Sequence, residues 1–208
     1  MRTMLRALGE TSITAGLILM LFCAYLLWGT GVYTEREQER LQRELTVAED
    51  GKPDTKQPRT IVPGSAVAVL RIPKLGPGYK YAVVEGVGTE DLKKGPGHYP
   101  GSAMPGQVGN FALAGHRTTY SAPFNKIDNL DRNDEIIVEA REARYTYWVT
   151  AHDVVHPTAI DEFAPVPGKP DARPARAFIT LSTCHPEYSA AQRYIVHGVL
   201  KSIEPREE

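Results

Sequence analysis

From residue 61 onward, the chain alternates between short apolar runs and polar turns. Seven runs are rich in Val, Ile, Thr and Tyr and are bounded by Gly, Pro, Asn or Asp, a pattern typical of β-strands. They cover residues 65–73, 80–87, 110–116, 134–140, 144–155, 177–183 and 193–201. No stretch of about a dozen residues among them has helical periodicity. The pattern predicts an all-β domain, either a sandwich or a small barrel.

This region defines one domain, which begins near Ile61 and ends near Ile203, with residues 204–208 as a C-terminal tail. A chain of 208 residues is one domain with appendages. The Pro-rich residues 164–175 predict a long surface loop, and loops of that length are usually functional or disordered. Charged residues make up 24% and the net charge is −1, which excludes the basic surface that nucleic acid would need.

The N-terminal part has a different pattern, a continuous apolar run. Residues 11–33 carry no charged side chain, and about 20 apolar residues span a bilayer as a helix. A cleaved signal peptide is the alternative, but it would have an apolar region of about 7–15 residues and small residues at its cleavage site. The run therefore predicts a transmembrane signal anchor, preceded by a cytoplasmic tail at residues 1–10. Arginines flank both sides, so the positive-inside rule does not settle the orientation.

Residues 34–60 connect this anchor to the domain. Leu41 and Leu45 lie four positions apart among mixed charges, which predicts a short juxtamembrane helix. So narrow an apolar stripe is expected to bury little surface. Residues 51–60 are polar and contain two prolines, and they predict a flexible tether.

One cysteine stands apart from the N-terminal run. Cys184 lies where a predicted strand gives way to a polar turn. Outside the cytoplasm cysteines normally occur in pairs, so a single one indicates a partner chain or a reactive thiol. A structural zinc site needs about four ligands, and no second cysteine is available for one. An inert buried thiol is the alternative, and the position at the end of a strand disfavours it.

A cysteine nucleophile needs a base nearby. The histidines of the domain are His98, His116, His152, His156, His185 and His197. His116 follows Ala and Gly at a strand end, which would present its ring to a groove, whereas His185 would face away from the adjacent Cys184. Arg193 opens the next predicted strand, where antiparallel pairing would place it beside Cys184. Its guanidinium is suited to stabilising an oxyanion.

These motifs resemble the signature of the sortases, the membrane-anchored cysteine transpeptidases of Gram-positive bacteria. Residues 180–184 read TLSTC, which matches the TLxTC motif of the family. The family's histidine follows Ala-Gly, as His116 does, and its arginine lies on the strand after the cysteine, as Arg193 does. The resemblance covers residues 61–203. It implies a closed β-barrel of about eight strands with short helices, and a catalytic set of His116, Cys184 and Arg193.

The stretch GPGHYPGSAMPGQVGNFALAGHRTTY is similar to actinobacterial class E sortases, in which a Tyr follows Gly-His, as Tyr99 does here. That class is associated with sorting signals of the Leu-Ala-x-Thr-Gly type rather than Leu-Pro-x-Thr-Gly. Without the proline the signal gains a backbone N–H, for which the Tyr99 hydroxyl would be an acceptor. A rim aromatic packed on the barrel is the alternative. Thr183 and Tyr120 are the other candidate substrate contacts, with local packing as the alternative for Thr183.

The resemblance implies that Cys184 attacks the Thr carbonyl of a sorting signal, that Arg193 stabilises the oxyanion and that His116 protonates the leaving Gly amine. The partners would be secreted proteins bearing the signal and an amine of a peptidoglycan precursor. No cofactor, metal or nucleic acid is expected. Whether the cysteine and the histidine rest as an ion pair or as neutral groups stays open, because their pKa values are coupled.

Three other classes of protein could carry a membrane anchor and a cysteine of this kind. Pilin-type sortases usually carry a second membrane span and a lid motif, and neither occurs in this sequence, which ends in KSIEPREE. The Ser-His-Gly-Cys motif of L,D-transpeptidases is also missing from it. A non-enzymatic membrane-tethered barrel would have an unreactive, buried thiol. The prediction is a single-pass cell-membrane sortase with its catalytic domain outside the cell.

Overall fold

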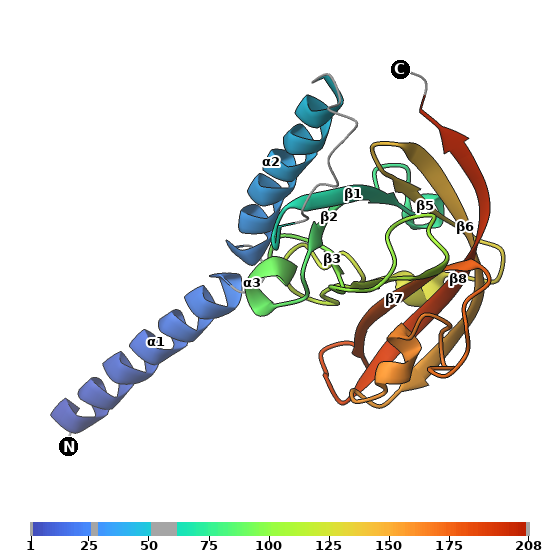
Figure 1. Ribbon diagram of the computed structural model, residues 1–208. Helices are drawn as coiled ribbons and strands as arrows, with labels where there is room; N and C mark the ends of the chain where they lie inside the picture. The colour runs from blue at the N-terminus through green and yellow to red at the C-terminus, as the bar shows by residue number, and fades with distance from the viewer. Residues whose placement is uncertain (1, 26–28, 51–61, 207–208) are drawn as a thin grey trace.

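The computed structural model describes residues 2–25, 29–50 and 62–206. Its folded part is a closed β-barrel with the strand order β1-β2-β3-β4-β7-β8-β6-β5 (Figure 1). The strands are β1 Ala66–Arg71, β2 Lys80–Glu85, β3 Gly97–His98, β4 Gly109–Ala114, β5 Glu135–Glu139, β6 Ala143–Val155, β7 Ala177–His185 and β8 Gln192–Pro205. The closed barrel of about eight strands is confirmed, and the sandwich is excluded.

Most neighbouring strands are antiparallel, but β2 with β3 and β4 with β7 are parallel. Parallel pairs need long connections. Short helices lie in the connections of the barrel: η2 Pro73–Leu75, α3 Thr89–Leu92, η3 Ile127–Asn129 and η4 Ile160–Phe163. The last of these belongs to the long connection from β6 to β7, which includes the Pro-rich loop predicted from the sequence. The seven predicted strands are present, and only β3, two residues long, was missed.

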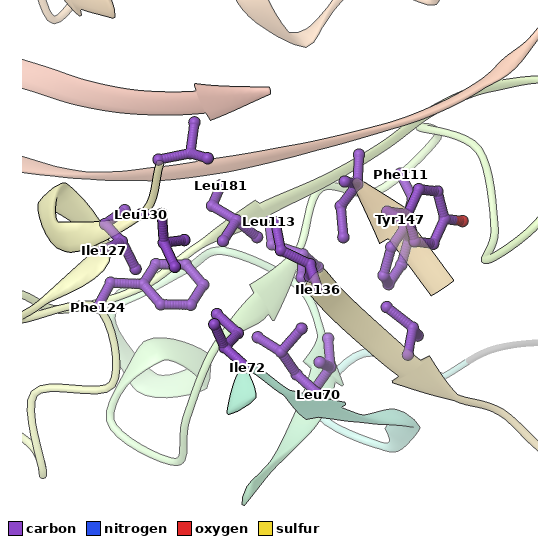
Figure 2. Packing of buried hydrophobic residues seen from close by; sticks show 14 of the residues in the cluster. Leu70, Ile72, Phe111, Leu113, Phe124, Ile127, Leu130, Ile136, Tyr147 and Leu181 are labelled. Carbon is purple, nitrogen blue, oxygen red and sulfur yellow. The ribbon is translucent and has the colours of Figure 1, made fainter. Parts of the chain in front are cut away.

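The barrel interior is filled by alternate residues of the strands. Phe111 and Leu113 of β4 point inward together with Leu181 of β7 and Ile136 of β5 (Figure 2). Each of these four side chains is fully buried. Side chains alternate along a strand, so the residues between them lie on the outer face of β4 and β7. The inner positions stabilise the barrel, and the outer positions are free for other roles.

Helix α2, Thr30–Asp50, packs against the outside of β1 and β2 (Figure 1). Leu41 is fully buried against Ala82 and Val84. The Gln38 amide brackets the backbone of Ala82, accepting from its N–H at 2.6 Å and donating to its carbonyl at 2.9 Å. It also donates to the carbonyl of Lys94. The expectation that this helix buries little was therefore wrong. Its narrow apolar stripe is supplemented by polar contacts that hydropathy does not reveal.

Helix α1, Arg2–Ala24, projects away from the barrel (Figure 1). None of its residues is buried, and within the described part of the chain it is the one helix long and apolar enough to cross a membrane. It begins earlier than the predicted span at residues 11–33. Residues 30–33 of that span belong to α2, and Thr30 there is buried. The predicted flexible tether at residues 51–60 lies outside the described residues.

Candidate active site

The candidate catalytic residues lie at the ends of three adjacent strands. β7 lies between β4 and β8 in the barrel. In the parallel pair of β4 and β7, Ala114 is aligned with Ser182. His116 and Cys184 each lie two residues beyond this aligned pair. In the antiparallel pair, Cys184 is directly opposite Arg193. The register therefore places the cysteine between the histidine and the arginine, with the thiol half-buried.

The exit of β4 is held tightly against β7. The Gly115 N–H donates to the Ser182 carbonyl at 3.0 Å, and the Thr183 hydroxyl donates to the Gly115 carbonyl at 2.8 Å. A Cβ added at Gly115 would lie 2.6 Å from a ring carbon of Phe124. Only a glycine allows this approach, which explains the small residue before His116. Thr183 is 2% exposed, so its geometry favours packing over a substrate contact.

His116 is half-buried beside Tyr120, with ring centroids 5.1 Å apart. Its Nε2 is buried and has no hydrogen-bond partner among the described residues. Burial lowers the pKa of His116, which favours the neutral imidazole. Tyr120 itself is half-buried and has a positive φ of 53°, in a turn that continues through Ser121 and Ala122. The turn keeps the aromatic ring over the imidazole.

Arg193 is anchored by the loop between β7 and β8. Its Nη1 donates to the carbonyls of Ala190 at 3.1 Å and Gln192 at 3.0 Å. These two bonds fix one edge of the guanidinium. A planar fork held in this way has the remaining N–H groups at fixed angles, and an oxyanion formed at Cys184 needs donors of this kind.

Tyr99 follows β3 and lies beside β4, because its backbone N–H donates to the Ala112 carbonyl at 2.9 Å. Burial raises the pKa of Tyr99, and the positive charge of Arg193 partly opposes that shift. The Tyr99 ring stacks on Phe163 of η4 with centroids 4.3 Å apart. The loop between β6 and β7 therefore contacts the tyrosine that the sequence selected.

Arg117 was not selected by sequence reasoning, yet it contacts the cysteine directly. Its side chain is 5% exposed, and its Nη1 donates to the Cys184 carbonyl at 3.2 Å and lies 3.2 Å from His185 Nδ1. Its Nη2 donates to the Asp128 carboxylate. The side chain that follows His116 in the sequence thus binds the backbone carbonyl of Cys184. The only sequence signal was its position next to that histidine, because its partners are distant along the chain.

The other histidines have different environments. His98 Nδ1 lies 2.6 Å from the Glu85 carboxylate in the barrel wall. His197 contacts Glu162. The ring of His185 is held by Arg117, whereas His152 and His156 are exposed. Of the six histidines, His116 is the one at the strand exit aligned with the cysteine. Within the described residues, no group of three or more His, Cys, Asp or Glu side chains is placed to hold a metal ion.

The barrel topology and this placement of cysteine, histidine and arginine agree with the resemblance carried by the sequence. A family model, the sortase domain, matches residues 70–201. Sortase SrtE1 of Streptomyces coelicolor is 34% identical over 209 residues, which cover 97% of this chain and 58% of that protein. The chain thus spans less than two thirds of that relative's length.

Comparison with solved structures also finds sortases. The SrtF sortase from Corynebacterium diphtheriae superimposes with a TM-score of 0.70 at 30% identity, covering 76% of this chain and 95% of that one. Sortase E from Streptomyces avermitilis gives a TM-score of 0.63 at 40% identity, covering 69% of this chain and 93% of that one. The chain therefore belongs to the sortase family, and its relatives include sortases of class E.

Proposed function

We propose that this protein is a class E sortase, a cysteine transpeptidase that cleaves a sorting signal between Thr and Gly and transfers the acyl group to an amine. The observation that carries the proposal is the register of β4, β7 and β8. It aligns the exits of the His116 and Cys184 strands and sets Arg193 opposite the cysteine. Family membership supports the same chemistry.

In the proposed reaction, Cys184 Sγ attacks the Thr carbonyl of the signal while His116 accepts the thiol proton. A neutral imidazole is needed for this step, and burial favours that form. The oxyanion is stabilised by N–H groups of Arg193. The intermediate then collapses to a thioacyl enzyme as His116 passes its proton to the leaving Gly amine. An acceptor amine attacks the thioester, releases the thiol and completes the transfer.

We propose a signal of the Leu-Ala-x-Thr-Gly type, presented by secreted proteins, with a peptidoglycan precursor as the amine acceptor. Tyr99 supports this preference, because its hydroxyl can accept a hydrogen bond from a backbone N–H that a proline lacks. Helix α1 is long and apolar enough to serve as a single-pass anchor, and membership of the sortase family supports a catalytic domain outside the cell.

The test is a mass-spectrometric assay with pentapeptides that differ only at the second position, Ala or Pro, supplied with and without an amine acceptor. We expect cleavage between Thr and Gly, an amide product with the acceptor, and preference for Ala. Cys184→Ala should abolish both products while the thermal transition is retained. Normal turnover by that variant would contradict the transpeptidase proposal.

Labelling with a thiol-directed probe separates this proposal from the non-enzymatic barrel. Cys184 is half-buried at a strand end, so the proposal predicts that the native protein is labelled there. A thiol that reacts only after unfolding would favour the binding-module alternative.

A further inference from the structure

A buried polar cluster fastens the loop between β6 and β7 to the barrel. The Glu162 carboxylate lies 2.9 Å from His197 Nε2, and the other ring nitrogen lies 3.0 Å from the Thr180 hydroxyl. That hydroxyl donates to Asn110 Oδ1 at 2.9 Å. The Asn110 amide donates to the carbonyls of Glu162 and Ala164. Side chains of β4, β7 and β8 thus hold one loop, and the catalytic proposal uses none of them.

The cluster lies on the same outer face as the proposed catalytic residues. Side chains alternate along a strand, so Thr180 shares a face of β7 with Cys184. By the same rule His197 shares a face of β8 with Arg193. Neither pairing has an irregularity that would break this alternation. Four residues of strand span about 13 Å, so the cluster and the thiol lie along one surface.

The loop also contacts Tyr99, the residue proposed to bind the sorting signal. Phe163 follows Glu162 in η4, and its ring stacks on Tyr99 with centroids 4.3 Å apart. A displacement of η4 would therefore remove the ring that supports Tyr99.

Hydrogen-bond accounting fixes the protons of the cluster. The Asn110 NH2 group faces two backbone carbonyls, so Oδ1 must face Thr180 and accept its only hydrogen. The Thr180 oxygen can then only accept from His197, which requires a hydrogen on Nδ1. The bond from Nε2 to Glu162 consequently needs one further proton, held either by the imidazole or by the carboxyl group.

We infer that Glu162 and His197 are positioning residues that share one proton and thereby hold Phe163 against Tyr99, the proposed substrate contact. The inference rests on the proposed function for the role of Tyr99. As the pH rises and the shared proton leaves, a bare nitrogen faces a carboxylate and the contact is lost. Burial lowers the pKa of His197, while the charges of Glu162 and of Asp153 on β6 oppose that shift. Substrate binding should therefore weaken on the alkaline side.

Glu162→Gln distinguishes this mechanism from a simple ion pair. The Gln amide can donate an N–H to the neutral Nε2, so the loop is held without the shared proton. Glu162→Ala removes the contact at every pH. Asp161→Asn is the matched control, because this neighbouring carboxylate is exposed.

Steady-state kinetics of the full-length protein with the Ala-containing peptide, from pH 5 to 9, should show KM of the wild type rising with pH. The Gln variant should keep a flat KM. At every pH the Ala variant should have a KM roughly 10-fold above that of the wild type at pH 5, equivalent to about 1.4 kcal/mol for one lost charge-assisted hydrogen bond, and the wild type should approach this KM at alkaline pH. For each variant, kcat should stay within about two-fold of the wild type at the same pH. A Gln variant that follows the wild-type curve, or an Ala variant with unchanged KM, would overturn the inference.

Hydrogen–deuterium exchange of residues 156–176 gives a readout that needs no turnover. On the acidic side, where the wild type keeps the contact, the Ala variant should exchange faster than the wild type. On the alkaline side, where the wild type has lost it, the Gln variant should exchange more slowly than the wild type, and the Ala variant should match the wild type. Equal exchange in all three proteins would reject the inference even if the protein is active. If the three proteins show the expected differences in exchange but none of them cleaves the peptide, the inferred contact stands and the proposed function is rejected.

Discussion

Arg193 lies opposite Cys184, and two backbone carbonyls hold one edge of its guanidinium. The proposed oxyanion role depends on this fixed planar fork, which a flexible ammonium does not reproduce. Loss of one oxyanion donor typically costs on the order of 100- to 1,000-fold in rate. We therefore expect Arg193→Lys to lose at least about 100-fold in kcat with little change in Tm. Kinetics on a fluorogenic sorting peptide would measure this, with a melting curve as control. A lysine variant that keeps most of its turnover would mean that only a nearby charge is needed.

His116 gives a prediction about pH. Burial lowers its pKa below the ordinary value of 6.5, so the folded protein binds this proton less readily than the unfolded chain. Its contribution to stability is fully present above the unfolded pKa and is lost as the pH falls through the folded pKa. Replacing His116 with Gln removes that contribution. Between pH 7 and 5, Tm should therefore fall less in His116→Gln than in the wild type. If Tm falls equally with pH in both proteins, folding does not lower the pKa of His116.

At the residue scale, the sequence predicts Cys184 and Arg193 as neighbours because a hairpin brings adjacent strand ends together. It also selects His116 from six histidines by the small residues before it. Arg117 was missed. Its partners, the Cys184 carbonyl and Asp128, are brought to it by the closing of the barrel, and no local pattern encodes a contact of that kind.

At the scale of the element, the strands were predictable because their inner residues must be apolar and alternate with outer ones. β3 was not, since Gly97–His98 has neither the length nor the β-branched residues of a strand. Helix α2 was predicted as a helix, but its docking was missed. Thr34 donates to the Lys93 carbonyl and Gln38 brackets Ala82, so part of the interface is polar. Hydrophobic periodicity detects only the apolar contacts.

The buried contact of α2 can be tested by substitution. Leu41 is fully buried in a small cluster, so Leu41→Ala should lower the free energy of unfolding by about 2–3 kcal/mol, at the lower end for such truncations. Leu45→Ala is the matched control, because this leucine is only partly buried against the same cluster and should cost less. Chemical denaturation of both variants would measure the difference. If both substitutions leave the free energy of unfolding nearly unchanged, helix α2 is not docked on the barrel in solution.

At the scale of the whole molecule, α2 links the apolar helix to the catalytic site. The Ser121 hydroxyl donates to the Gly31 carbonyl at 3.3 Å, and Tyr120 in the same turn packs on His116. The start of α2 thus supports the turn beside the proposed base. We therefore expect α2 to belong to the folded unit together with the barrel, whereas the sequence alone predicts a domain that begins near Ile61.

Two truncations test this. Removing residues 1–29 deletes α1, which is exposed along its length, and should leave Tm and peptide turnover close to those of the full chain. Removing residues 1–61 also deletes α2 and exposes Ala82 and Val84, which are fully buried in the intact protein. We expect this longer truncation to lower the free energy of unfolding by about 2–3 kcal/mol, which corresponds to a fall in Tm on the order of 5–10 °C for a domain of this size. The longer truncation should also lower kcat/KM, because the turn beside His116 loses its support from Gly31. If the two truncated proteins melt and turn over alike, α2 contributes nothing to the barrel and the boundary near Ile61 stands.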